Sequence, residues 1–198
     1  MPPEPAHQPG FTAAVLAGGR STRMGTDKAF LRIGGELLIA RQLRVLKEAG
    51  AAELLISGRK GVDYADSGAR VVYDEETDAG PLAGLVAILH AASFPIVLVL
   101  AVDMPNMTSA MLRKILAQCE NNSGCVPADN EGFQPLAAAY PKTALALARQ
   151  CLNDRTYAMR EFASRAVKRG VARRLELEPS DRNHFANWNH PWDWPTQR

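Results

Sequence analysis

Residues 16–28 read Leu-Ala-Gly-Gly-Arg-Ser-Thr-Arg-Met-Gly-Thr-Asp-Lys, and they follow a short apolar run at 12–15. That run contains small and β-branched residues and predicts a buried strand. Gly18 and Gly19 allow a sharp turn and a close approach of the backbone to a ligand, and successive N–H groups in such a turn can bind an anion. The loop also carries three cations: Arg20, Arg23 and Lys28. It therefore predicts a polyphosphate-binding loop at the end of a strand.

Two common phosphate-binding motifs do not account for this loop. In a Walker A loop a lysine follows the last glycine, whereas Thr26 follows Gly25 here. The G-x-G-x-x-G pattern separates its first two glycines, but Gly18 and Gly19 are adjacent. The stretch instead resembles the signature L-A-G-G-x-x-x-R-M-G-x-D-K of nucleotidyltransferases with a Rossmann-like catalytic domain. Among them it is most similar to the molybdenum cofactor guanylyltransferases, which join GMP to molybdopterin.

Length and composition fit a single globular domain. The chain has 198 residues, of which 46% are hydrophobic and 22% charged. We expect residues 1–10, with four prolines, to be a flexible tail and residues 11–198 to form the nucleotidyltransferase domain. The tail lacks the features of a signal peptide, and no run reaches the roughly 18 apolar residues of a membrane span. Three cysteines without metal-ligand spacing are expected to be reduced, which together with these features predicts a cytoplasmic protein.

Strand-like and helical stretches alternate along the chain. Apolar residues at helical spacing predict helices over 36–49 and from Pro81 onward, and the continuous apolar run 95–101 predicts a central parallel strand buried on both faces. Further strands are expected at 53–57, 70–73 and 135–140, and further helices after Thr108 and over 142–152 and 156–166. This order predicts an open α/β sheet. The resemblance implies a single-domain, three-layer α/β/α fold with a mostly parallel central sheet.

Asp103 directly follows the central apolar run, in Ala101-Val102-Asp103-Met104-Pro105. A carboxylate there would lie at the same sheet edge as the glycine loop, since ligands of open α/β sheets bind beyond the carboxyl ends of the strands. Mg²⁺ is commonly held by one or two carboxylates together with phosphate oxygens and water. The alternative is an aspartate that caps the next helix. The resemblance favours the magnesium site, because family members carry Asp-x-Pro at this place.

A second block joins Tyr73-Asp74 to Gly80-Pro81-Leu82-Ala83-Gly84. Asp74 ends a predicted strand, and Pro81 suits the first turn of a helix. The G-P-L-A-G motif resembles the guanylyl-transferring branch, where it lies against the guanine. Ser57 occupies a position where relatives often carry Asn, and one hydroxyl replaces two amide functions there. The resemblance implies this nucleotide site: Leu16, Ala17, Gly18, Gly19, Lys28, Ser57, Asp74, Gly80, Leu82 and Asp103.

Asn187-Trp188-Asn189, followed by His190 and Pro191, resembles the late N-x-N-T-P segment of the family. An asparagine of that segment completes the magnesium site in the family, and amide oxygens are suitable ligands for Mg²⁺. Asn187 and Asn189 are both candidates, and an ordinary Asx-rich turn is the structural alternative.

The acceptor side carries weaker motifs. Gln134, in Gly-Phe-Gln-Pro-Leu, and Arg155, in Asp-Arg-Thr, match family segments near the molybdopterin pocket. Residues 149–174 hold eight basic side chains against two acidic ones within a chain of net charge +2. A solvated helical face and a docking surface for an anion or partner both fit this excess. Nucleic acid does not, since no nucleic-acid motif is present.

The resemblance implies transfer of GMP from GTP to molybdopterin, with Mg²⁺ as cofactor and release of pyrophosphate. Arg23, Lys28 and Asp103 are the expected catalytic residues, and molybdoenzymes or their chaperones are possible protein partners. The alternatives are a cytidylyltransferase acting on the same acceptor, a sugar-nucleotide pyrophosphorylase, and a non-catalytic adaptor that binds nucleotide or molybdopterin. No membrane partner is expected.

Overall fold

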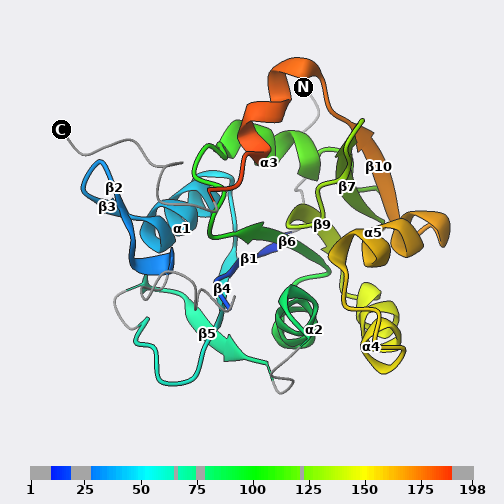
Figure 1. Cartoon of the computed structure of the whole chain (residues 1–198), viewed down its shortest axis with the longest axis horizontal. Helices are drawn as coiled ribbons and strands as arrows, with labels where there is room; N and C mark the ends of the chain where they lie inside the picture. Colours follow the sequence, from blue (N-terminus) through cyan, green and yellow to red (C-terminus); the bar gives the residue numbers. More distant parts are fainter. Residues whose placement is uncertain (1–9, 19–27, 65–66, 75–78, 121–122, 189–198) are drawn as a thin grey trace, which may run out of the picture.

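A computed structural model describes residues 10–18, 28–64, 67–74, 79–120 and 123–188. Residues 1–9 lie outside these ranges, so the predicted N-terminal tail stays a prediction. Through the described part runs an eight-stranded sheet of order β10-β7-β9-β6-β1-β4-β5, with β8 paired to β7 (Figure 1). Its strands are β1 Thr12–Leu16, β4 Glu53–Gly58, β5 Arg70–Tyr73, β6 Ile96–Ala101, β7 Gly124–Asp129, β8 Gly132–Phe133, β9 Ala137–Pro141 and β10 Ala172–Glu176. A separate two-stranded sheet joins β2 Arg32–Ile33 to β3 Glu36–Leu37.

Helices cover both faces of the large sheet (Figure 1). They are α1 Leu38–Glu48, α2 Pro81–Ala91, α3 Ser109–Leu116, α4 Ala144–Asn153 and α5 Met159–Lys168, with 3₁₀ turns η1 Lys28–Phe30 and η3 Pro179–Phe185. Successive residues of a strand point to opposite faces. In β1, Ala13 and Val15 therefore pack with α1 and α3, whereas Ala14 and Leu16 pack with α2, α4 and α5. The three-layer α/β/α architecture is confirmed.

The central strand is predicted correctly in its burial and only in part in its pairing. Residues 97–101 of β6 are buried, and β6 pairs in parallel with β1. On its other side it pairs antiparallel with β9, which also runs antiparallel to β7. The sheet is mostly parallel because β1, β4, β5 and β6 share one direction and β7 and β10 pair in parallel.

Helix starts follow the expected chemistry. The Thr108 hydroxyl accepts a hydrogen bond from the Met111 amide at 3.3 Å and caps α3. Gly80 precedes α2 with φ +61°, a conformation that favours glycine, and Pro81 occupies the first turn. The Thr108 cap and the position of Pro81 were predicted.

Other expectations need correction. Residues 36–37 form strand β3, and helix α1 begins only at Leu38. Strands β7 and β10 were not predicted: Pro127 interrupts the pattern of β7, and the exposed arginines of β10 resemble a polar loop. The basic stretch 149–174 is consequently not one helical face, since it spans α4, α5 and the start of β10.

Two further observations concern the chain as a whole. All three cysteines are free thiols, and Cys125 and Cys151 are buried. Burial raises the pKa of Cys119 to about 11 and that of Cys125 to about 12, so both thiols are protonated at neutral pH. Within the described ranges, no helix is long and apolar enough to cross a membrane.

Candidate active site

The site begins where four strands end at one edge of the sheet. The register places Leu16 of β1 opposite Ser57 of β4 and Ala101 of β6. One residue further along, Gly58 pairs with Tyr73 of β5, so that Asp74 leaves the sheet beside the same row. Two backbone hydrogen bonds extend the row into the loops: Ala17 N to Ser57 O at 3.0 Å and Val102 N to Leu16 O at 3.2 Å. The sheet thus brings together residues that are far apart in the sequence.

Gly18 faces two of the predicted nucleotide residues. A Cβ at Gly18 would lie 3.6 Å from the Ser57 hydroxyl oxygen and 3.9 Å from Oδ2 of Asp74. Ser57 is only 1% exposed and packs closely against α2, because a Cβ at Gly84 would lie 2.5 Å from its Oγ. The glycine loop, β4, β5 and the G-P-L-A-G motif therefore converge, as the sequence predicts.

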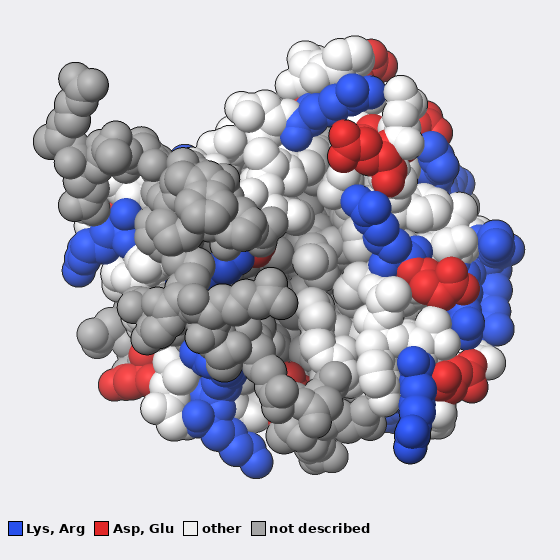
Figure 2. Space-filling model, viewed as in Figure 1, with Lys and Arg blue, Asp and Glu red and all other residues white. Residues whose placement is uncertain are grey.

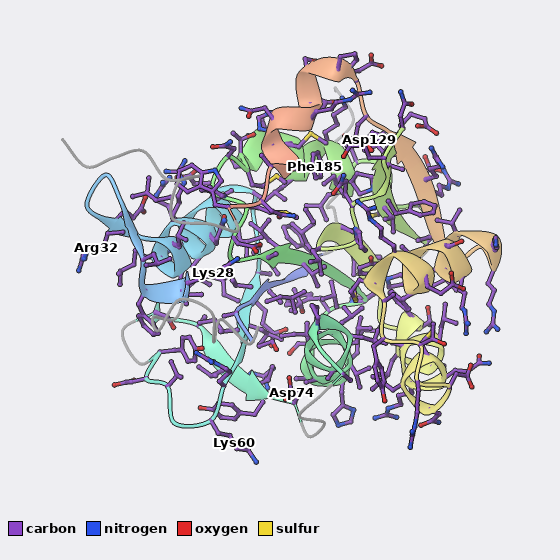
Figure 3. The ribbon with its side chains drawn as sticks, in the orientation of Figure 1. Lys28, Arg32, Lys60, Asp74, Asp129 and Phe185 are labelled. Carbon is purple, nitrogen blue, oxygen red and sulfur yellow. The ribbon has the colours of Figure 1, made fainter. Side chains whose placement is uncertain are left out.

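Asp74 is half-buried at the end of β5 and lies beside α2 (Figure 3). Burial raises the pKa of its carboxyl group, and the positive charge of Lys60 opposes that rise. Asp74 also lines a groove of about 810 Å³ formed by β5, α2 and α4. A carboxylate at such a place can accept hydrogen bonds from a base or a ribose.

The side chain of Leu82 is buried and does not face a ligand. It is 0% exposed and packs in the core between α2 and the sheet, so only its backbone is available to a nucleotide. Leu16 and Ala17 are also buried, and the polar groups that they offer are backbone groups as well.

Lys28 and Asp103 form an ion pair at the centre of this edge. The Lys28 ammonium group donates to Oδ2 of Asp103 at 3.2 Å, with side-chain exposures of 17% and 22%. Figure 3 shows Lys28 close to the central strands. Lys28 begins η1, and Asp103 follows β6. The cation that the sequence predicts to bind phosphate and the carboxylate that it predicts to bind Mg²⁺ are thus in direct contact.

The C-terminal segment reaches the same place. The Trp188 backbone N–H donates to the Asp103 carbonyl oxygen at 2.9 Å. Asn187, which is exposed and directly precedes Trp188, is therefore close to the backbone of Asp103. Three predicted site residues, Gly19, Arg23 and Asn189, lie outside the described residues.

The two acceptor candidates, Gln134 and Arg155, lie in different loops. Gln134 is half-buried after β8, and its backbone N–H donates to the Pro127 carbonyl at 2.8 Å. Arg155 is exposed in the turn between α4 and α5 with φ +55°, the left-handed region that non-glycine residues rarely adopt. The described residues show no hydrogen bond between Arg155 and Gln134.

The basic stretch around Arg155 is partly neutralised. Arg165 pairs with Asp154 and Glu161, Arg173 with Glu120, and Arg174 with Glu176. Figure 2 shows acidic and basic side chains interspersed over the side of the molecule that carries α4, α5 and β10.

Two residues of α1 that also reach the site were missed. The Gln42 amide donates to the carbonyls of Val102 and Met104, and Arg41 donates to that of Pro105. The sequence does contain a signal for the burial of Gln42. This polar residue lies three positions after Ile39, on the apolar stripe that Leu43 and Leu46 continue.

Comparisons with known proteins agree with this geometry. A family model described as MobA-like NTP transferase domain matches residues 13–170. The chain belongs to this family. It is therefore a nucleotidyltransferase, as its sequence predicts.

Two relatives match almost the whole of this chain over almost their own full length. A protein of Opitutus terrae named probable molybdenum cofactor guanylyltransferase is 41% identical over 196 residues, which cover 98% of this chain and 97% of that protein. A molybdenum cofactor guanylyltransferase of Xanthomonas euvesicatoria is 34% identical over 190 residues, covering 93% and 92%. The solved molybdopterin-guanine dinucleotide biosynthesis protein A of Archaeoglobus fulgidus matches with TM-score 0.71 and 22% identity over 92% of this chain and 94% of that one. At that identity it supports the fold alone.

Proposed function

We propose that this protein transfers GMP from GTP to the terminal phosphate of molybdopterin, with or without bound molybdenum. The observation that carries the proposal is the convergence of Gly18, Ser57 and Asp74 with the Lys28–Asp103 pair at one sheet edge. The names of the full-length relatives favour this acceptor and guanine as the base.

The nucleotide would lie across the ends of β1, β4 and β5. Asp74 and Ser57 offer polar atoms to the base or ribose, and Gly80 and Leu82 offer backbone groups. The loop of Gly18 and Gly19, together with Arg23 and Lys28, would hold the triphosphate through backbone N–H groups and positive charge.

The residues at Asp103 suit Mg²⁺. The described chain has no cluster of three or more His, Cys, Asp or Glu that could hold a metal, and Mg²⁺ at a nucleotide site needs only one or two carboxylates beside phosphates and water. Asp103 would supply the carboxylate, and Asn187 or Asn189 an amide oxygen. Bound Mg²⁺ supplies positive charge that neutralises the phosphates of GTP.

The acceptor needs little chemical activation. Its phosphate monoester has a second pKa near about 6 and is mostly dianionic at neutral pH. A phosphate oxygen attacks the α-phosphorus of GTP, a new P–O bond forms, and the bond to the β-phosphate breaks to release pyrophosphate. The protein must hold two anions in line and stabilise the charge on the leaving group. Lys28 and Arg23 would do so on the nucleotide side, and Gln134 and Arg155 would orient the acceptor.

We also propose a cytoplasmic location, where GTP is available and the three free cysteines stay reduced. Molybdoenzymes or their chaperones would then receive the product.

The test is pyrophosphate release from the purified protein with Mg²⁺ and molybdopterin, with GTP, CTP and ATP in parallel. Release with GTP alone is the expected result. A preference for CTP would contradict guanine recognition by Ser57, Asp74 and the G-P-L-A-G motif. Saturable GTP binding without release would indicate an adaptor.

A further inference from the structure

The loop that carries Asp103 is held through five consecutive backbone carbonyls. Gln42 donates to Val102 O at 3.3 Å and to Met104 O at 2.8 Å, and Arg41 donates to Pro105 O at 2.8 Å. On the other side, the Trp188 amide donates to Asp103 O, and Nδ1 of His184 lies 2.9 Å from Asn106 O. Every donor comes from α1 or from the C-terminal segment, both distant in sequence.

Gln42 occupies the centre of this arrangement. Its side chain is 0% exposed, and its amide nitrogen spans the carbonyls on either side of Asp103, so both of its N–H groups are used. Because two acceptors face it, the nitrogen and not the oxygen of the amide must point at the loop.

The glutamine at position 42 leaves a buried polar atom unpaired, which indicates a role beyond core packing. Oε1 of Gln42 is buried and has no hydrogen-bond partner among the residues that the structure describes, and an unpaired buried acceptor is unfavourable. An apolar side chain would fill the same core position on the stripe of Ile39, Leu43 and Leu46 without that cost. An apolar side chain would, however, lose the hydrogen bonds to the carbonyls of Val102 and Met104.

We propose that Gln42, supported by Arg41, is a positioning residue that fixes the Asp103 carboxylate for metal binding. The inference deepens the proposed function and rests on it. Gln42 touches neither nucleotide nor metal. It limits the backbone freedom of residues 102–104, so that the carboxylate is ordered before the metal arrives.

The experiment measures metal binding and activity separately. Mn²⁺ binding is followed by electron paramagnetic resonance of the free ion, with and without GTP, and an Asp103→Asn variant defines the binding that depends on Asp103. Pyrophosphate release is measured against Mg²⁺ concentration, and thermal unfolding reports stability. The variants are Gln42→Met and Arg41→Met, with Arg44→Met as the matched control. Arg44 lies on the same helix and pairs with Glu36, as Arg41 does, and it also pairs with Glu48.

Gln42→Met is expected to weaken Asp103-dependent Mn²⁺ binding by about tenfold, as substitutions of residues that orient metal ligands do, and to raise the half-saturating Mg²⁺ concentration. Arg41→Met should act in the same direction and Arg44→Met should not. Wild-type Mn²⁺ affinity in a folded Gln42→Met protein, or no Asp103-dependent Mn²⁺ binding in the wild type, would overturn the proposal. If Gln42→Met does not fold, the comparison of Arg41→Met with Arg44→Met decides. A wild type that binds Mn²⁺ through Asp103 but releases no pyrophosphate would contradict the proposed function and leave the Gln42 proposal standing.

Discussion

Lys28 forms an ion pair with Asp103 and directly follows, in the sequence, the stretch proposed to bind phosphate. Its bond to Asp103 is partly exposed, and such pairs contribute about 1 kcal/mol or less to stability. Charge stabilisation of transferring phosphates is worth far more to the reaction rate. Lys28→Ala is therefore expected to lower turnover about a hundredfold while unfolding at nearly the wild-type temperature. Steady-state kinetics and calorimetry measure the two effects, with the exposed Lys47→Ala on α1 as control. Unchanged turnover would remove Lys28 from the mechanism.

Gly84 and Ser57 form a second residue-scale unit. A methyl group at Gly84 would lie 2.5 Å from Ser57 Oγ and 3.3 Å from its Cβ, so Gly84→Ala must displace the hydroxyl. Loss of the proposed hydrogen bond from Ser57 to the nucleotide predicts about a tenfold weaker affinity for GTP.

A double-mutant cycle distinguishes this effect from general damage to α2. Ser57→Ala removes the oxygen that clashes, so adding Gly84→Ala to it should cost little further affinity. Isothermal titration with GTP measures all four proteins. Additive losses would show that Gly84 acts through something other than Ser57.

At the scale of elements, Glu53 ties the starts of several strands together. Its carboxylate accepts hydrogen bonds from Thr12 of β1 at 2.6 Å, from Arg70 of β5 at 2.9 Å and from the amide and hydroxyl of Ser93. Burial disfavours the charged form, but these donors outweigh it and lower the pKa of Glu53 to about 2. The far end of the sheet from the site is thus fixed by one ionised side chain.

The pH dependence of stability follows from this shift. Because the folded pKa lies below the unfolded one, the stabilisation is complete above about pH 4.5 and is lost as the pH falls toward 2. The Glu53 side chain is 16% exposed, so solvent screens it in part, and we expect a loss of about 1–2 kcal/mol over that window. Urea unfolding at pH 6, 4 and 3 measures it, and Glu53→Gln should flatten the dependence. A variant with the wild-type slope would assign the acid sensitivity to other groups.

The elements also show how far a sequence determines its fold. Helices α1 and α2 were predicted because their apolar residues recur at helical spacing, and strand β6 because its apolar residues form a continuous run. Strand β10 was missed because its exposed arginines contribute nothing to the core. The reversal of β9 depends on pairing between distant strands, which local periodicity does not encode. The role of Gln42 was not predicted for a related reason. Its hydrogen-bond partners, Val102 and Met104, are 60 and 62 residues away in the sequence.

At the scale of the whole molecule, the site joins both halves of the core. Strands β1, β4 and β6 pack helices on both faces, and a nucleotide across their ends would link loops from each side. The motifs around Gly18 and Asp103 were predictable because glycine and carboxylate have distinctive chemistry. Their place at one sheet edge was predicted as well, but the order of the strands between them was not, since it depends on pairing between distant strands.

Ligand binding should therefore stabilise the entire fold. A ligand at a hundred times its dissociation constant adds about 2.7 kcal/mol, which corresponds to a rise of about 5–10 °C in the unfolding temperature of a chain of this size. Scanning calorimetry with GTP and Mg²⁺ should show this rise, and CTP at the same concentration a smaller one. Asp103→Asn should lose the part that depends on Mg²⁺, because the Asp103 carboxylate is the proposed charged ligand of the metal. Equal shifts with GTP and CTP would mean that the edge binds triphosphate without reading the base, and the choice of nucleotide would then have to be made after binding.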